Sequence, residues 1–181
     1  MEDIDPVHDL IHQPDYQALS AQQQRLVIAS YTLRSLRLVE MFDRRYNQCL
    51  ADLFCHGLSV YIAGRASESR DLHANIEAHI PDTDEFSEQE ASYAQNAFIA
   101  LFYLIGATAT GDAALLQRSI NMTLENVDLL YYERDPDYLQ MELTAAEQHV
   151  LDNLLEQAAA TSSAEPATFE LIEAMTSPHR L

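Results

Sequence analysis

Residues that interrupt helices are scarce in this 181-residue chain, which has four glycines and six prolines. An all-β fold needs more turn residues than this, so the scarcity argues against one. The prolines stand between segments of apolar periodicity and not inside them, where proline would remove a helical hydrogen bond. The composition therefore predicts an all-α protein.

Lysine is absent, and the ten basic residues face 29 acidic ones, which gives a net charge of −19. Such a surface repels nucleic-acid phosphates and anionic lipid headgroups, so direct binding of nucleic acid or of a membrane is not expected. The acidic balance has two interpretations. It could serve solubility, as in a salt-tolerant bacterium, or it could steer a basic protein partner into contact.

Features that define membrane and secreted proteins are missing as well. No apolar run reaches the roughly 18 residues of a membrane span, and residues 1–10 lack the basic and apolar regions of a signal peptide. These absences predict a cytoplasmic protein. Cys49 and Cys55 are the only cysteines, and their spacing fits neither a CxxC motif nor one helical face, so we expect buried free thiols.

The sequence has no motif for catalysis or phosphate binding. No glycine-rich loop, GxSxG elbow or zinc-type Cys/His spacing is present. His8-Asp-x-x-His12 would place two histidines on one helical face, but it lies between two prolines and fits a surface turn better than a metal site. No histidine follows a Glu by three residues, so the di-iron bundle motif is absent too. We predict no cofactor and no metal site, and we expect His56 to be a packed histidine.

One stretch, Ile80 to Ala109, organises the predicted fold. Its second half is apolar on every side, which is typical of a helix surrounded by protein. Ser87-x-x-Glu90 has the pattern of a capping box that begins this helix, and Gly111 suits its C-cap. We predict a single-domain bundle of about six helices around a central hydrophobic helix at about 87–109.

Apolar periodicity and capping patterns predict the other helices. Capping boxes occur at Ser20-x-x-Gln23 and Thr144-x-x-Glu147, and Asp112 suits an N-cap. Gly57 lies inside a helix, where it would allow another helix to approach closely. The expected helices span residues 20–42, 46–63, 68–79, 113–132 and 144–160.

The chain is expected to have three segments. Residues 1–19 form an N-terminal lead-in segment, and residues 20–160 form the helical domain. Residues 161–181 form a tail that is rich in Ser, Ala and Thr. This tail could form a short docking helix or stay mobile.

Acidic residues are the candidate binding groups. Asp82, Asp84 and Glu85 lie in a loop where no capping role explains them. Farther along, Glu125 and Asp128 are three residues apart and share a helical face. Such a pair could bind a metal or perform acid–base chemistry, and it could equally belong to a solvated face.

The basic residues gather in one part of the chain. Four of its arginines are Arg34, Arg37, Arg44 and Arg45. We expect them to be solvated and to pair with the acidic helices nearby. Alternatively, they could hold an anion.

Three stretches carry a family resemblance. They are Ile80-Pro-Asp-Thr-Asp-Glu-Phe86 with Ser92-Tyr-Ala-Gln-Asn-Ala97, then Asn126-Val-Asp128, and then Leu139-Gln-Met-Glu142 with Glu147-Gln148. Together they resemble the YjaG-like family of small bacterial proteins, which is classed as a domain of unknown function. Asn96 stands where that family's pattern has Asp. The resemblance covers roughly residues 20–158 and implies an all-helical fold, but it implies no reaction.

These observations favour a non-catalytic cytoplasmic protein that binds another protein, with a basic partner expected from the charge. An inhibitor or immunity-like protein that masks a basic site is one form, and a homodimer is expected. The binding residues would be Asp82, Asp84, Glu85 and Asp128. The alternative is a metal-dependent enzyme in which carboxylates such as Asp82, Asp84 and Asp128 converge with a histidine from the helices at 46–63 or 68–79.

Overall fold

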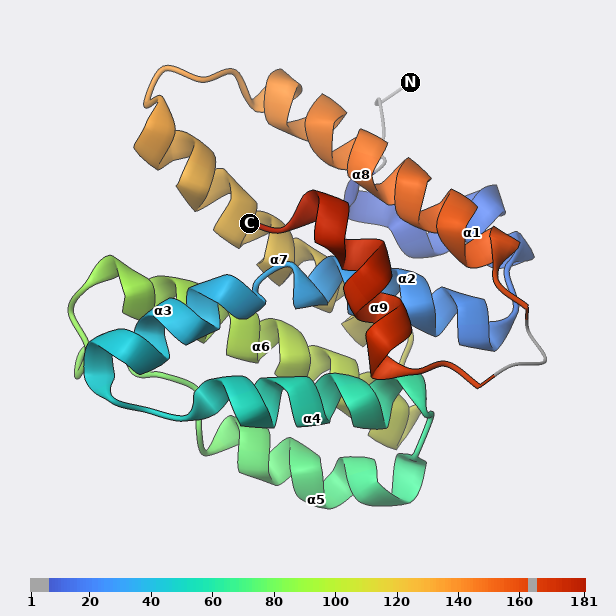
Figure 1. Ribbon diagram of the computed structural model, residues 1–181, viewed down its shortest axis with the longest axis horizontal. Helices are drawn as coiled ribbons and strands as arrows, with labels where there is room; N and C mark the ends of the chain where they lie inside the picture. Colours follow the sequence, from blue (N-terminus) through green and yellow to red (C-terminus); the bar gives the residue numbers. More distant parts are fainter. Residues whose placement is uncertain (1–6, 163–165) are drawn as a thin grey trace.

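Helices form most of the chain that the computed structural model describes, residues 7–162 and 166–181, and no strand occurs among them (Figure 1). The all-α prediction is therefore confirmed. The prediction about a signal peptide falls mainly on residues 1–6, outside the described part. The elements in chain order are η1 (Val7–His12), α1 (Pro14–Ala18), α2 (Ala21–Leu33), α3 (Leu36–Tyr46), α4 (Leu50–Ile62), α5 (Ala66–Glu77), α6 (Gln89–Thr110), α7 (Ala114–Arg134), α8 (Gln140–Ala160), α9 (Phe169–Thr176) and η2 (Ser177–His179).

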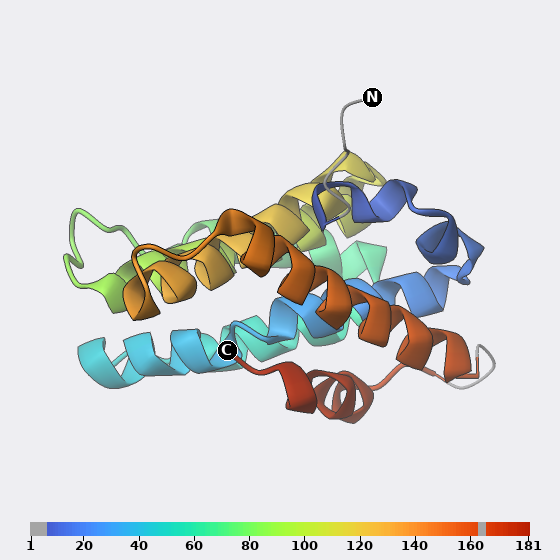
Figure 2. The ribbon, with the colours of Figure 1, turned by 90° about the horizontal axis from the view of Figure 1, so that it is seen from above.

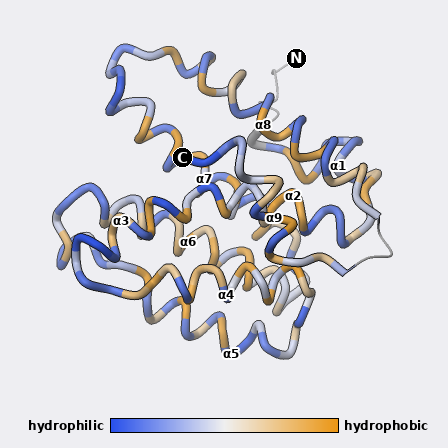
Figure 3. The backbone as a smooth tube through the Cα atoms, viewed as in Figure 1, coloured by the Kyte–Doolittle hydropathy of each residue, from blue (hydrophilic) through white to orange (hydrophobic). Residues whose placement is uncertain are grey.

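The predicted central helix is α6, which packs against α2, α3, α4, α5 and α7. Phe98, Leu101, Leu104 and Ile105 are fully buried along it. Each contributes about 1.5–3 kcal/mol of burial energy. Figure 3 shows hydrophobic residues concentrated on the inner helices, α6 among them, while the outer connections are hydrophilic.

A second helix, α2, is buried as completely, which the sequence did not lead us to expect. Residues 26–35 are buried without interruption, and α2 packs against α4, α7, α8 and α9. Figure 2 shows α8 crossing α2. Small hydroxyl residues make this burial possible, because Thr32 lies 3.5 Å from the Ser119 hydroxyl and Ser30 lies 3.7 Å from the Met175 sulfur.

The helix predicted at 20–42 is divided into α2 and α3. Arg34 and Ser35 lie at the break, and their amides donate to the carbonyls of Tyr31 and Thr32, three residues earlier. Such bonds tighten the last turn into 3₁₀ geometry. This break, together with short helices at both ends of the chain, explains why the described residues form more helices than predicted.

The capping predictions succeed at the start of α2 and at the end of α6, where Gly111 is the C-cap, and they fail at the starts of α6, α7 and α8. The box at Ser20 and Gln23 is present at the start of α2. The box at Thr144 is wrong because α8 begins at Gln140, which places Thr144 inside the helix. Asp112 accepts a hydrogen bond from the amide of Ala114, but it is not the N-cap of α7.

The predicted capping box at Ser87 is also wrong. Helix α6 begins at Gln89, and the residue before it makes no side-chain cap. The Phe86 ring packs against those of Phe42 and Tyr46, with centroids 5.1 and 4.7 Å apart. This aromatic cluster keeps the chain at Ser87 in the loop, so the helix begins later.

Gly57 sits where two helices approach closely, as predicted. A Cβ atom at this position would lie 2.8 Å from a methyl group of the buried Leu101. Alanine has the higher helix propensity, by about 1 kcal/mol, but the clash with Leu101 opposes this gain. We therefore expect Gly57→Ala to lower the free energy of unfolding by about 1–3 kcal/mol. Urea unfolding measures this loss. The combination with Leu101→Ala should be less destabilising than the sum of the two single losses, and strict additivity would contradict the contact.

The C-terminal tail contains α9, which packs against α2 and α4. Ile172 and Met175 are buried there, and the Thr176 hydroxyl donates to the carbonyl of Ser30 at 3.0 Å. At the other end of the chain, η1 packs against α7 and α8.

Two smaller expectations were wrong. Both cysteines are free, but Cys49 is exposed and Cys55 is half-buried, because they lie at the start and on the outer side of α4. His56 is exposed as well and not packed. Among the helices of residues 7–162 and 166–181, none is long and apolar enough to cross a bilayer.

Candidate functional site

The predicted loop carboxylates lie together on the surface, and one has a structural role. Asp82, Asp84 and Glu85 are all exposed. The Asp82 carboxylate accepts a hydrogen bond from the amide of Asp84 at 2.9 Å. The Asp82 carbonyl accepts the amides of Glu85 and Phe86. Asp82 therefore shapes the turn that leads to α6, which short-range sequence patterns did not reveal.

Asp128 belongs to a different part of the molecule. It is half-buried on α7 and accepts a hydrogen bond from the hydroxyl of Tyr138. The metal-enzyme alternative required such carboxylates to converge with a histidine. Among the described residues, no three His, Cys, Asp or Glu side chains are grouped so that they could hold a metal.

The histidine pattern near the N-terminus does not form a helical pair. Val7–His12 is a 3₁₀ helix, with non-helical backbone at Asp9. The His12 Nδ1 atom lies 2.5 Å from the Asp9 carboxylate, and the His8 side chain lies outside the described part. Among the other histidines, His73 stacks on Phe102 with ring centroids 3.9 Å apart.

Arg34, predicted to be solvated, is buried in an ion pair. Only 4% of Arg34 and 2% of Glu147 are exposed. Both terminal nitrogens of Arg34 donate to the Glu147 carboxylate, one of them at 2.9 Å. The Tyr31 hydroxyl donates to the same carboxylate at 2.7 Å, and the Arg34 Nε atom donates to the His179 carbonyl at 2.8 Å.

Hydrogen bonding and charge keep Arg34 protonated in spite of its burial. Burial acts to lower the pKa of Arg34, but the hydrogen bonds and the charge of Glu147 outweigh it and raise that pKa. Burial, followed by the charge of Glu147, raises the pKa of Tyr31 well above its usual value. These hydrogen bonds join the end of α2 to α8 and to the C-terminal tail, so the pair has a structural role.

The end of α7, the start of α8 and the connection between them expose apolar side chains. We define residues 132–142 as the hairpin tip. Of the four large apolar side chains exposed among the described residues, three lie here: Tyr132 (58%), Leu139 (60%) and Met141 (79%). In Figure 1 the hairpin tip lies at the upper left, where α7 and α8 meet.

Exposed acidic residues are interspersed with these apolar residues along the hairpin tip. The hairpin tip has four exposed acidic residues and one arginine. The acidic ones are Glu133, Asp135, Asp137 and Glu142. An apolar patch with an acidic rim is the arrangement that a basic protein surface with an apolar centre would complement.

Local hydrogen bonds give the hairpin tip a defined shape. The Asp135 carboxylate accepts the amide of Asp137 at 3.1 Å, and its carbonyl accepts the amide of Tyr138. The Tyr138 ring packs against Tyr131 with centroids 5.6 Å apart. The hydrogen bond to Asp128, with smaller contributions from burial and nearby carboxylates, raises the pKa of Tyr138 to about 12.

Replacing Tyr138 by phenylalanine should lower the free energy of unfolding by about 0.5–1.5 kcal/mol at neutral pH, because the bond to Asp128 is lost. The folded pKa lies above the unfolded value of about 10, so this stability is present below pH 10 and disappears as pH rises through 12. Urea unfolding of both proteins between pH 7 and pH 11 measures it. A difference that grows with pH would contradict the assignment.

The hairpin tip was not among the residues chosen from the sequence. Its signal was the Asp135-Pro-Asp137 loop flanked by tyrosines and by Leu139-x-Met141, but periodicity alone does not show that such residues are exposed. A scan against protein-family models, a search of curated proteins and a search of solved structures each found no match. The resemblance to the YjaG-like family therefore stays a prediction.

Proposed function

We propose that this protein is non-catalytic and acts by binding a basic protein partner through the hairpin tip. One observation carries the proposal: three large apolar side chains, Tyr132, Leu139 and Met141, are exposed within the hairpin tip. A contiguous exposed apolar patch with a polar rim is typical of a protein-interaction site. Tyrosine and methionine are also enriched at interfaces.

The charge of the chain supports a basic partner. The net charge is −19, and the hairpin tip contributes four carboxylates to it. Such a field accelerates association with a positively charged surface and repels acidic proteins. Burial of the three apolar side chains would then hold the complex, at about 1.5–3 kcal/mol each before the losses of association.

An inhibitor or immunity-like protein that covers a basic site is the form of this function that we favour, and we propose that it acts in the cytoplasm. The predicted homodimer is a separate proposal, which sedimentation of the purified protein tests. Such a dimer would have to form through another surface, because two acidic hairpin tips repel one another.

Affinity capture from cell lysate tests the proposal. The wild-type chain should retain a basic protein at low salt and release it at high salt, because screening weakens charge attraction. Leu139→Ser combined with Met141→Ser should lose that protein at both salt concentrations. Met41→Ser is the matched control, since Met41 is exposed by 38% on α3, outside the hairpin tip.

Three results would count against the proposal. One is that the Leu139 and Met141 variant captures the same protein as the wild type. Another is that capture does not change with salt. The third is that Met41→Ser abolishes capture as completely as the hairpin-tip variant does.

A further inference from the structure

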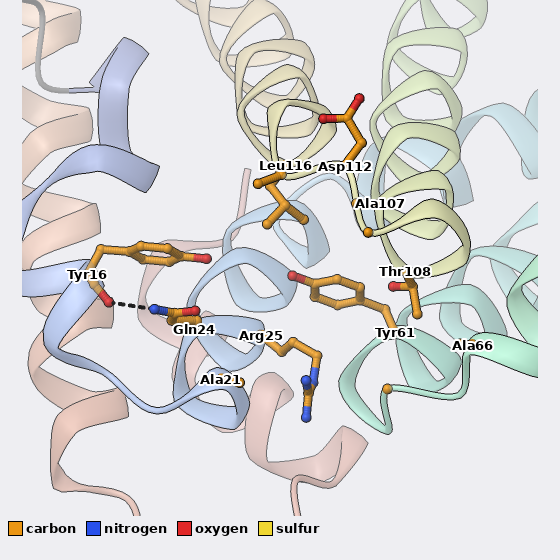
Figure 4. A pocket seen from close by; sticks show the side chains of 13 residues that line it. Tyr16, Ala21, Gln24, Arg25, Tyr61, Ala66, Ala107, Thr108, Asp112 and Leu116 are labelled. Carbon is orange, nitrogen blue, oxygen red and sulfur yellow. Dashed lines mark hydrogen bonds between the residues drawn. The ribbon is translucent and has the colours of Figure 1, made fainter.

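A cavity of about 330 Å³ lies where α1 and the beginnings of α2 and α7 meet the ends of α4 and α6. Two tyrosines reach into it from different helices, Tyr16 from α1 and Tyr61 from α4. Figure 4 shows their hydroxyl groups pointing toward one another across the cavity. Leu116 from α7 lies above them in this view, and Arg25 from α2 lies below.

The two tyrosine side chains are buried, but their hydroxyl groups face the open cavity and are unpartnered. Only 4% of Tyr16 and 3% of Tyr61 are exposed, and neither hydroxyl has a hydrogen-bond partner among the described residues. Burial raises the pKa of both groups, against the lowering effect of Arg25, so both are protonated at neutral pH. Each hydroxyl can donate one hydrogen bond and accept others, so both are available to a molecule that enters the cavity.

Arg25 supplies positive charge to the same cavity. Its Nε atom donates to the carbonyl of Ile62 at 3.2 Å, and within the described chain its terminal nitrogens have no partner and no carboxylate pairs with it. Gly64 leaves room for the guanidinium, because a Cβ atom there would lie 3.3 Å from the Arg25 Cζ atom. A half-buried arginine without a carboxylate is unexpected in so acidic a chain, and it is suited to an anion.

We propose that this cavity binds a small organic carboxylate that also carries a hydroxyl or carbonyl oxygen. Its carboxylate would pair with Arg25, and its second oxygen would lie between the hydroxyls of Tyr16 and Tyr61. Its apolar body would contact Leu116 and Ala107, which line the cavity. The strongly negative field of the chain disfavours a multiply charged anion such as phosphate, and the volume fits a compact ligand.

This site is separate from the hairpin tip. Leu116 lies near the beginning of α7 and Tyr132 near its end, so they are about 25 Å apart at 1.5 Å per residue. Loss of one site therefore leaves the other in place, and the two proposals fail independently.

Calorimetric titration with 4-hydroxybenzoate tests the proposal. We expect saturable binding with one site per chain. The neutral analogue 4-hydroxybenzamide and the variant Arg25→Gln should each weaken binding at least tenfold, because the charge pair is lost. Tyr16→Phe combined with Tyr61→Phe should have a similar effect. Tyr103 lies outside the cavity, so the control variant Tyr103→Phe should leave the affinity for 4-hydroxybenzoate unchanged.

The unliganded variants separate a binding role from a structural one. Removing two unpartnered hydroxyls should leave the melting temperature of the Tyr16 and Tyr61 variant unchanged or raised. Tyr31→Phe removes a hydroxyl that donates to Glu147, and it should lower the melting temperature. No saturable binding of 4-hydroxybenzoate, equal binding of the amide, or a lower melting temperature without those two hydroxyls would each overturn the proposal.

Discussion

Glu147→Ala should lower the free energy of unfolding by about 3–5 kcal/mol, because it leaves the Arg34 charge buried without a partner. Arg34 is only 4% exposed, so water cannot replace the lost carboxylate. The Tyr31 hydroxyl loses its acceptor in the same change. Urea unfolding followed by circular dichroism measures the loss.

A compensated variant distinguishes the loss of charge balance from the loss of volume. Arg34→Met, Tyr31→Phe and Glu147→Leu together replace the ion pair and the tyrosine hydroxyl bonded to it, and they should recover most of the stability, since apolar replacements of buried ion pairs are often neutral or stabilising. A loss below about 1 kcal/mol for Glu147→Ala alone would contradict the burial of the pair.

Phe98→Ala should have an effect of similar size, about 3–5 kcal/mol, because it opens a cavity on the central helix. Phe98 is fully buried on α6, with the Phe54 ring centroid 6.0 Å away. The same unfolding experiment gives the value.

Phe102 is the matched control for this prediction, one helical turn farther along α6. It is half-buried and stacks on His73, so Phe102→Ala should remove about 1–2 kcal/mol. Equal losses of unfolding free energy at Phe98 and Phe102 would contradict the deeper burial of Phe98 on α6.

Some local patterns predicted the fold correctly, although the capping patterns at Ser87, Asp112 and Thr144 did not. The apolar run of α6, the cap at Ser20 and the close approach at Gly57 all follow from residues near one another in the chain. Arg34 could not be placed in this way, because its partner Glu147 is 113 residues away. A charged residue is expected at the surface unless such a partner is known.

The candidate site shows the same limit. Asp82 was chosen because no local pattern explained it, yet it bonds to the backbone of Asp84. Asp128 was chosen for its spacing from Glu125, yet it holds Tyr138. The exposed side chains of the hairpin tip become recognisable only when the packing of α7 and α8 is known, because apolar residues in a sequence are normally expected inside.

The central claim is that the hairpin tip, and not overall acidity, selects the partner. Two triple variants test it directly because each removes three negative charges. Asp135→Asn, Asp137→Asn and Glu142→Gln change the hairpin tip, whereas Asp82→Asn, Asp84→Asn and Glu85→Gln change the loop before α6.

The association rate of the captured partner with each variant, measured over a range of salt concentrations, is the deciding measurement. We predict that the hairpin-tip variant associates at least tenfold more slowly at low salt and shows a weaker salt dependence, while the loop variant stays within about twofold of wild type. Equal slowing by both variants, or a larger effect of the loop variant, would contradict the account.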